Sequence, residues 1–194
     1  MRTALTILCI AMILTSCKEA KTNTEDNSLA TDIVEEVAPV AKKVLSPHTA
    51  AMAMIGDAHI HIDYASPGVR NRIVFGGLLA YDTVWQAGAH NATWIETNKD
   101  LLISGQVLPA GKYGFFTIPS KETWTLIFNS NWDQHGKDEY DEKEDVLRFT
   151  VTPEISEEIT EHLIYTVTEI DETHGAISLS WEKVSLKFNF EINN

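Results

Sequence analysis

The chain has 194 residues, 44% of them hydrophobic, and carries 28 acidic against 15 basic side chains, for a formal net charge of −13. Such an excess of negative charge repels phosphate backbones and anionic lipid surfaces, so we expect no nucleic-acid partner and no electrostatic contact with a membrane. Acidity of this size also keeps a protein soluble, which explains it more simply than an acidic site for cations.

The first segment of the chain has the pattern of a secretory signal. Arg2 precedes the apolar run 4–14, which is too short to span a bilayer as a helix. The following stretch, Leu14-Thr15-Ser16-Cys17, resembles the lipobox of bacterial lipoproteins, in which the cysteine is diacylated and becomes the mature N-terminus. We therefore predict a lipoprotein signal peptide over residues 1–16 and lipidation at Cys17. Incorporation of labelled palmitate would detect this lipid. Membrane contact is then expected through the lipid on Cys17.

The other cysteine, Cys9, lies in the segment that would be removed, so the mature chain has no cysteine pair for a disulfide.

Residues 17–48 contain no aromatic residue, and this composition buries too little apolar surface to offset the entropy of ordering. A flexible chain of about 30 residues has a reach on the order of 30 Å. We expect a tether over residues 17–48 that joins a domain over residues 49–194 to the bacterial envelope. The outer membrane is favoured, with the periplasmic and the surface face both left open.

From about residue 49 the sequence changes to short runs of β-branched and aromatic residues separated by turn residues. This texture is typical of an all-β sandwich or barrel, and about 145 residues can bury a core without a disulfide. We predict a single antiparallel β-sandwich, jelly-roll-like or immunoglobulin-like. Turns are expected at Ser104-Gly105, Pro109-Ala110-Gly111 and Glu182-Lys183. The predicted strands cover residues 52–56, 59–64, 92–98, 100–108, 112–119, 124–130, 146–153, 161–170, 176–183 and 184–192.

The stretch HIHIDY, residues 59–64, alternates polar and apolar side chains. In a strand this period places His59, His61 and Asp63 on one face and the apolar residues on the other. Two histidines and a carboxylate on one face form a candidate metal site. Two histidines on a solvent-facing sheet surface are the simpler alternative.

The stretch WQAGAHNATWIE, residues 85–96, contains a small-residue turn between two tryptophans. The turn would lift His90 and Asn91 to the rim of the sheet, with Trp85 and Trp94 below or beside them. Imidazole and amide groups next to aromatic faces suit a polar ring such as a sugar, because stacking and hydrogen bonding are both available. Alternatively, Trp85 fills the core and Asn91 only forms the turn.

The stretch from residue 131 to residue 148 carries seven acidic residues between Asp133 and Asp145. Its spacing does not fit an EF-hand, so we predict a long charged loop. Loops of this length in compact domains are often functional, and Trp132, His135 and Tyr140 are candidates for a wall of the same site. The mature chain has no G-x-S-x-G, H-E-x-x-H, P-loop or cysteine nucleophile.

From about residue 49 to residue 192 the sequence resembles a bacterial family known as domain of unknown function 2911. The resemblance is carried by YASPGVRNRIVFGGLLAYDTVWQAGAHNAT, LPAGKYGFFTIP, WTLIFN and YDEKEDVLR. It implies a secreted or lipid-anchored envelope protein, of a kind common in the Bacteroidota, with a β-sandwich-like domain and no established activity. The motif positions that match are Tyr64, Pro67, Arg72, Trp85, Gly88, Ala89, Ala92, Thr93, Gly111 and Arg148.

The chain departs from the usual pattern of that family at three places. Ser66 and Gln86 stand where arginine is frequent, and His90-Asn91 stands where Asn-Glu is usual. A ligand contact that needs a carboxylate at position 91 is therefore not expected in this chain.

These patterns favour a noncatalytic, lipid-anchored module that binds a small polar ligand, either a glycan fragment or a metal-bound species. No cofactor is expected. One alternative is a structural module whose partner is another envelope protein, and another is a hydrolase that uses a histidine or a bound metal. The predicted ligand-binding residues are Arg72, Trp85, His90, Asn91, Trp94, Trp132 and His135, and the predicted metal ligands are His59 and His61.

Overall fold

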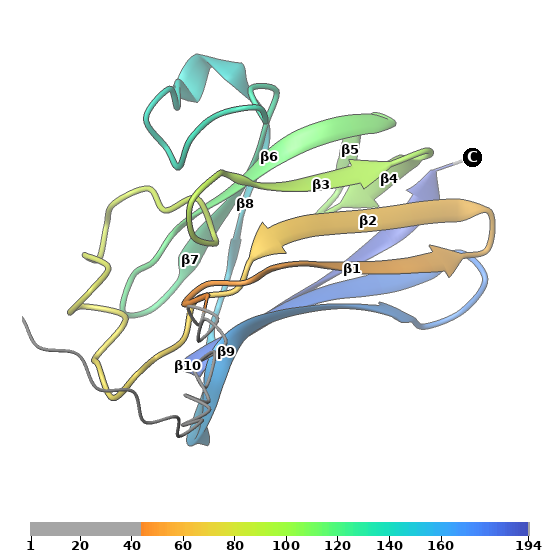
Figure 1. Ribbon diagram of the computed structural model, residues 1–194. Helices are drawn as coiled ribbons and strands as arrows, with labels where there is room; N and C mark the ends of the chain where they lie inside the picture. Colours follow the sequence, from red (N-terminus) through yellow and green to blue (C-terminus); the bar gives the residue numbers. More distant parts are fainter. Residues whose placement is uncertain (1–43, 194) are drawn as a thin grey trace, which may run out of the picture. The chain divides into compact units, whose positions relative to one another are not determined.

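Two antiparallel β-sheets make up the part of the chain that the structure, a computed structural model, describes: residues 44–193 (Figure 1). The larger sheet has the strand order β1-β2-β3-β6-β7-β8, and the smaller sheet has the order β5-β4-β10-β9. The sheets pack around one main hydrophobic core, which confirms the predicted antiparallel β-sandwich. The strands are β1 (His48–Ile55), β2 (Ala58–Ala65), β3 (Thr93–Thr97), β4 (Asp100–Ile103), β5 (Gln106–Leu108), β6 (Gly111–Ile118), β7 (Trp124–Asn129), β8 (Asp145–Val151), β9 (Glu154–Glu169) and β10 (His174–Asn193).

Helical structure is confined, within residues 44–193, to the short 3-10 turn η1 (Glu142–Glu144). No helix in this part of the chain has the length and apolar character needed to cross a membrane. The predicted signal peptide (residues 1–16), the predicted lipidation site Cys17 and the predicted tether up to residue 43 lie outside the described residues.

β2 shows how the sequence directs one face of a strand to the core. The side chains of Ile60 and Ile62 are fully buried, whereas the alternating side chains of His59, His61 and Asp63 are partly exposed. Successive side chains of a strand point to opposite faces, so the period of two in the sequence predicted this arrangement correctly. The polar face of β2 therefore belongs to the outer surface of the larger sheet.

An aromatic cluster joins the long connection between β2 and β3 to the core. The rings of Trp85 and Trp181 stack with their centroids 5.6 Å apart, and Phe75 packs edge-on against both. Phe75 and Trp85 come from the connection over residues 66–92, and Trp181 comes from β10. The connection is thus part of the core, which fixes the position of the turn that follows Trp85.

The turn predicted at Ser104-Gly105 is confirmed, because both residues have a positive φ between β4 and β5. The turn predicted at Glu182-Lys183 is wrong, because β10 continues through it. Glu182 has a φ of +57°, and the pairing with β9 shifts register on both sides of it, so the irregular backbone forms a β-bulge. The carboxylate of Glu182 accepts a hydrogen bond of 3.2 Å from the backbone N–H of Val74 and so ties this bulge to the connection.

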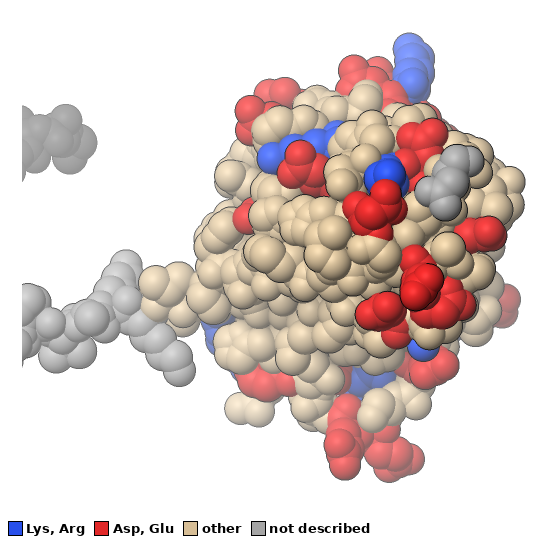
Figure 2. Space-filling view, turned by 90° about the vertical axis from the view of Figure 1, so that its right-hand side faces the viewer, with Lys and Arg blue, Asp and Glu red and all other residues tan. Residues whose placement is uncertain are grey.

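The surface is acidic, as the net charge of −13 requires. Figure 2 shows clusters of acidic side chains on the face that it draws, with fewer basic side chains among them. A field of this sign attracts cations to the molecule and repels anions from it.

Candidate functional site

The turn over residues 85–93 forms one wall of the candidate site. The indole Nε1 of Trp85 donates a hydrogen bond of 2.9 Å to the carbonyl oxygen of Gly88. The buried hydroxyl of Tyr165 donates one of 2.7 Å to the carbonyl oxygen of Ala87. Burial raises the pKa of Tyr165 well above its usual value, which keeps this hydroxyl protonated as a donor. Hydrogen bonds from the core therefore hold the turn in one conformation.

The backbone of this turn is strained at two residues that are not glycine. Ala87 has a φ of +52° and His90 a φ of +62°. Residues in sparsely populated regions of this kind cost about 1–3 kcal/mol each, and they concentrate at functional sites. A Cβ atom on Gly88 would lie 2.5 Å from Thr93 Oγ1, so only glycine fits beside it. The result is that His90 and Asn91 are exposed at the rim of the sheet.

The second wall comes from the loop over residues 130–144. The backbone N–H of Ala92 donates a hydrogen bond of 3.0 Å to the carbonyl oxygen of Gln134, and Asn91 forms an isolated β-bridge with His135. These contacts hold the loop beside the turn over residues 85–93.

A glycine in β6 lets this loop lie directly on the outer face of the sheet. A Cβ atom on Gly114 would lie 3.0 Å from the carbonyl oxygen of Asn131 and 3.2 Å from the Cα of Trp132. Gly114 pairs with Trp94 of β3, so the same approach brings the two tryptophans together. Their ring centroids are 6.4 Å apart, with an angle of 66° between the ring planes.

A polar network fixes the far end of the loop. The carboxylate of Asp145 accepts hydrogen bonds from Asn129 Nδ2 at 2.8 Å and from the hydroxyl of Tyr140 at 2.9 Å. Arg148 pairs with the same carboxylate at 2.9 Å and with Glu142 at 2.8 Å. Burial, followed by the bond to Asp145, raises the pKa of Tyr140 well above its usual value. The family stretch YDEKEDVLR therefore serves to hold the loop that carries Trp132.

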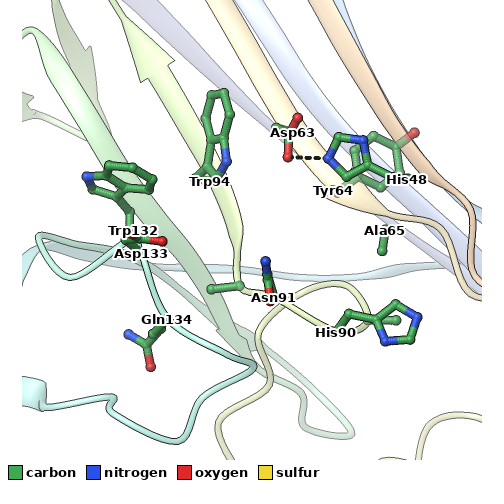
Figure 3. Close-up of a pocket in the computed structure, with 12 residues that line it drawn as sticks. His48, Asp63, Tyr64, Ala65, His90, Asn91, Trp94, Trp132, Asp133 and Gln134 are labelled. Atoms are coloured by element: carbon green, nitrogen blue, oxygen red, sulfur yellow. Dashed lines mark hydrogen bonds and ion pairs between the residues drawn. The ribbon is translucent and has the colours of Figure 1, made fainter.

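A pocket of about 140 Å³ lies between the two walls (Figure 3). On the side formed by β1 and β2, His48 Nε2 and Asp63 Oδ1 are 2.8 Å apart, and Asp63 pairs directly with Trp94 of β3. Figure 3 shows Trp94 between this pair and Trp132. The lining residues are His48, Asp63, Tyr64, Ala65, Ala89, His90, Asn91, Ala92, Trp94, Trp132, Asp133 and Gln134.

The aromatic side of the pocket continues over the outer face of the larger sheet. The ring of His61 packs edge-on against Trp94 with a centroid distance of 4.8 Å. The Nζ of Lys112 lies 3.5 Å from the ring centroid of Trp94 and 3.6 Å from that of Trp132. Both indoles therefore already contact a cation.

Four of the predicted ligand-binding residues, His90, Asn91, Trp94 and Trp132, line this pocket together. They come from three segments of the chain: the turn, β3 and the loop over residues 130–144. Among them the amide of Asn91 and the imidazole of His90 are exposed.

The other three predicted ligand-binding residues do not line the pocket. Trp85 is 4% exposed and belongs to the aromatic core cluster. Arg72 uses its guanidinium to donate to the carbonyl oxygens of Val69 and Gly68 within its own loop. His135 is exposed next to the pocket, and its Nδ1 lies 3.3 Å from the carboxylate of Asp138.

The two predicted metal ligands, His59 and His61, lie side by side on β2 with their ring centroids 6.0 Å apart. Within residues 44–193, no group of three or more histidine, cysteine or acidic side chains has the arrangement needed to hold a metal ion. His61 instead contacts Trp94.

Sequence reasoning missed four side chains of the site and considered Asp63 only as a partner of the β2 histidines. The four are His48, Lys112, Asp133 and Gln134. His48 lies at the first residue of β1, and only the pairing of β1 with β2 brings it to Asp63. For Lys112 the sequence holds a signal. Residues two apart on a strand lie on the same face, so Lys112 shares a face with Gly114, and a glycine in a strand often marks a place where another segment approaches closely.

The family described as "Protein of unknown function (DUF2911)" matches residues 46–190, which confirms the resemblance found in the sequence. No curated protein and no solved structure matches the chain. Since the family match extends over more than half of the 194 residues, this chain belongs to the DUF2911 family of proteins of unknown function.

Proposed function

We propose that this chain is a lipid-anchored protein of the bacterial envelope whose β-sandwich binds a small polar ligand without chemical conversion, and that the ligand is a glycan fragment. The observation that supports the proposal is the pocket in which the indoles of Trp94 and Trp132 meet the exposed polar groups of His90 and Asn91. Aromatic faces next to an amide and an imidazole suit a ring that has apolar faces and hydroxyl groups at its edge.

The size of the pocket limits what it can enclose. A volume of about 140 Å³ corresponds to about five water molecules, so it accepts part or all of one sugar ring. The side-chain amide of Gln134 has partners within the loop, because it donates to Asn131 at 2.8 Å and accepts from the Glu139 backbone N–H at 3.0 Å. Asn91 is therefore the amide that we assign to the ligand.

Anchoring in the envelope rests on the sequence of the first segment. The signal pattern over residues 1–16 and the lipobox-like residues before Cys17 support export and lipidation. The lipid on Cys17 would be the contact with the membrane, and the outer membrane is the location we propose. A tethered binding domain of this kind would sample ligands close to that membrane.

Binding can be tested with the 15N-labelled full-length protein. We expect N-acetylglucosamine, glucose or galactose to shift the indole resonances of Trp94 and Trp132 and the side-chain amide of Asn91. Asn91→Ala should weaken binding by about ten-fold, since one good hydrogen bond to a ligand is lost. Asn189→Ala, an exposed asparagine on β10, is the matched control and should bind like the parent. If none of the sugars in this panel shifts any of these resonances, the proposal is wrong.

A role in protein interaction is the second candidate, and the edge strand β9 favours it. Ile155, Ile159 and Ile164 are 71%, 56% and 46% exposed on this strand. Exposed apolar side chains on a sheet edge are places where another chain can pair. If this role is correct, Ile159→Lys should abolish co-purification of an envelope protein with the full-length chain while leaving the sugar-dependent shifts unchanged.

A further inference from the structure

The ammonium group of Lys112 lies between two indoles. Its Nζ is 3.5 Å from the ring centroid of Trp94 and 3.6 Å from that of Trp132, and the two centroids are 6.4 Å apart. The negative faces of aromatic rings attract alkylammonium groups, and ligand sites for quaternary ammonium groups are built from such rings. Trp94 and Trp132 thus form two walls of a cleft with the geometry of a cation site, and Figure 3 shows both at the edge of the pocket.

Lys112 has a second partner available when it leaves the indoles. It lies on β6 directly opposite Glu96 of β3, and the Glu96 side chain is exposed. None of the ion pairs among residues 44–193 includes Lys112. Because opposite charges at directly paired positions of an antiparallel sheet attract each other, Lys112 can exchange its contact with the indoles for a cross-strand contact with Glu96. Lys112 can therefore leave the cleft between the tryptophans and still have a partner for its charge.

The surroundings of the pocket also favour a positive ligand. Asp63 and Asp133 both line it, and Asp133 is exposed. Asp63 pairs with His48 at 2.8 Å, and among residues 44–193 neither carboxylate forms an ion pair with a lysine or an arginine. The protein as a whole carries a formal net charge of −13, so its field concentrates cations rather than anions. Carboxylates and indole faces around one cavity are complementary to an amine and not to a uronate or a sulfate.

We infer that the ligand of this pocket carries a protonated amino or alkylammonium group, which takes the place between Trp94 and Trp132 that Lys112 now holds. Lys112 is then an internal competitor, which a positively charged ligand displaces more readily than a neutral one does. The inference rests on the proposed function and adds the charge of the ligand to it, so that an amino sugar is a ligand of the right class.

The test compares choline with 3,3-dimethylbutan-1-ol, a neutral molecule of the same shape, as ligands of the full-length protein. Binding is followed through the indole resonances of Trp94 and Trp132. We expect choline to shift both resonances and the neutral alcohol to shift neither. Lys112→Met removes the competitor and should tighten choline binding by about ten-fold. Lys187→Met, which changes the net charge equally on an exposed position of β10, should leave the affinity for choline unchanged.

Two further variants separate a cation site from a general electrostatic effect. Trp94→Ala and Trp132→Ala should each abolish the shifts caused by choline, while Asp171→Asn, which removes a distant surface carboxylate, should not. Equal binding of choline and the neutral alcohol, or no gain from Lys112→Met, would overturn the inference. If sugars without an amino group shift the Asn91 amide while choline shifts neither indole, the binding function stands and the inference on charge is wrong. If neither sugars nor choline shift any of these resonances, both are wrong.

Discussion

The hydroxyl of Tyr165 on β9 donates a hydrogen bond of 2.7 Å to the carbonyl oxygen of Ala87, in a turn 78 residues earlier in the chain. Tyr165 also packs edge-on against Tyr64 of β2, with a centroid distance of 4.7 Å. The hydrogen bond from Tyr165 to Ala87 joins the smaller sheet to the turn that forms one wall of the pocket. The conformation of the turn is therefore set by the core of the sandwich and not by its own sequence alone.

Tyr165→Phe should remove this hydrogen bond with little change in packing. We expect the free energy of unfolding to fall by about 1 kcal/mol, because the Ala87 carbonyl keeps a bond from Thr93. The turn should also open more readily, so that backbone amides of residues 85–93 exchange hydrogen faster. Tyr113→Phe is the matched control, since its hydroxyl bonds to the Pro109 carbonyl elsewhere at 2.9 Å. If both variants change exchange in the turn equally, Tyr165 has no specific role there.

Gly114→Ala should displace the loop that carries Trp132. The new Cβ would meet Phe116 Cε2 at 2.8 Å, the Asn131 carbonyl oxygen at 3.0 Å and the Trp132 Cα at 3.2 Å. Overpacking of this kind costs about 1–3 kcal/mol. We expect an equal loss in the free energy of unfolding, together with changed indole resonances of Trp132 and Trp94. A variant with parental stability and parental indole resonances would show that the loop does not depend on this close approach.

The strands were predictable wherever polar and apolar side chains alternate. β2 is the clearest case, because burial follows the period of two from Ala58 to Tyr64. β9 was predicted only from residue 161, whereas it begins at Glu154. Residues 154–159 are all exposed, so no buried side chain marks them, and their pairing with β10 through the backbone makes them a strand. The bulge at Glu182 was mistaken for a turn because the pair Glu182-Lys183 falls between two alternating runs, whereas β10 continues through both residues.

The pocket was only partly predictable for a related reason. Residues close in sequence, such as His90, Asn91 and Trp94, could be grouped from one stretch, and they do line one pocket. His48 was missed because β1 was predicted only from residue 52, whereas it begins at His48 and pairs with β2 along its whole length. Lys112 reaches the two tryptophans through the register of β6 against β3. Register between distant strands depends on the whole fold, so a single sequence does not reveal such neighbours.

The pair Asp171 and His174 at the end of β9 should make stability depend on pH. Hydrogen bonds, first from the Thr173 backbone and then from His174, lower the pKa of Asp171 from 3.8 to about 2. The bond to Asp171, at 2.9 Å, is the main cause that raises the pKa of His174 above 6.5, and Glu191 at 3.9 Å contributes. Both groups are on the surface, so the effect is small.

The sign of each contribution follows from linkage. The lowered pKa of Asp171 stabilises the fold above pH 3.8, and this stabilisation is lost as the pH falls toward 2. The raised pKa of His174 stabilises the fold below pH 6.5, and this stabilisation is lost as the pH rises through the pKa of His174 in the folded protein. His174→Gln should therefore reduce the free energy of unfolding at about pH 5.5 and have less effect at about pH 8.5. Urea unfolding at the two pH values measures this, and an equal effect at both would contradict it.

Cys17→Ala should abolish lipidation and release the protein from the membrane. Only the cysteine after a lipobox accepts the lipid, so labelled palmitate should be incorporated in the parent and not in this variant. Cys9→Ala is the matched control, because this cysteine lies within the predicted signal peptide and labelling should persist. Continued labelling of Cys17→Ala would show that Cys17 is not the lipidated residue, and a parent without label would show that the chain is not a lipoprotein.

Two substitutions in the turn over residues 85–93 should separate a binding residue from a core residue. Trp85→Ala removes a side chain that is 4% exposed and stacks on Trp181, and we expect it to lower the free energy of unfolding by about 3–5 kcal/mol. His90→Asn keeps a residue type that tolerates the φ of +62° while it removes the imidazole from the rim. Its free energy of unfolding should stay within about 0.5 kcal/mol of the parent, because His90 is exposed, and its affinity for the bound sugar or amine should fall. Urea unfolding and the indole resonances of Trp94 measure the two effects on the same samples. A loss of about 2 kcal/mol or more in His90→Asn, with unchanged ligand affinity, would instead make His90 a structural residue of the turn.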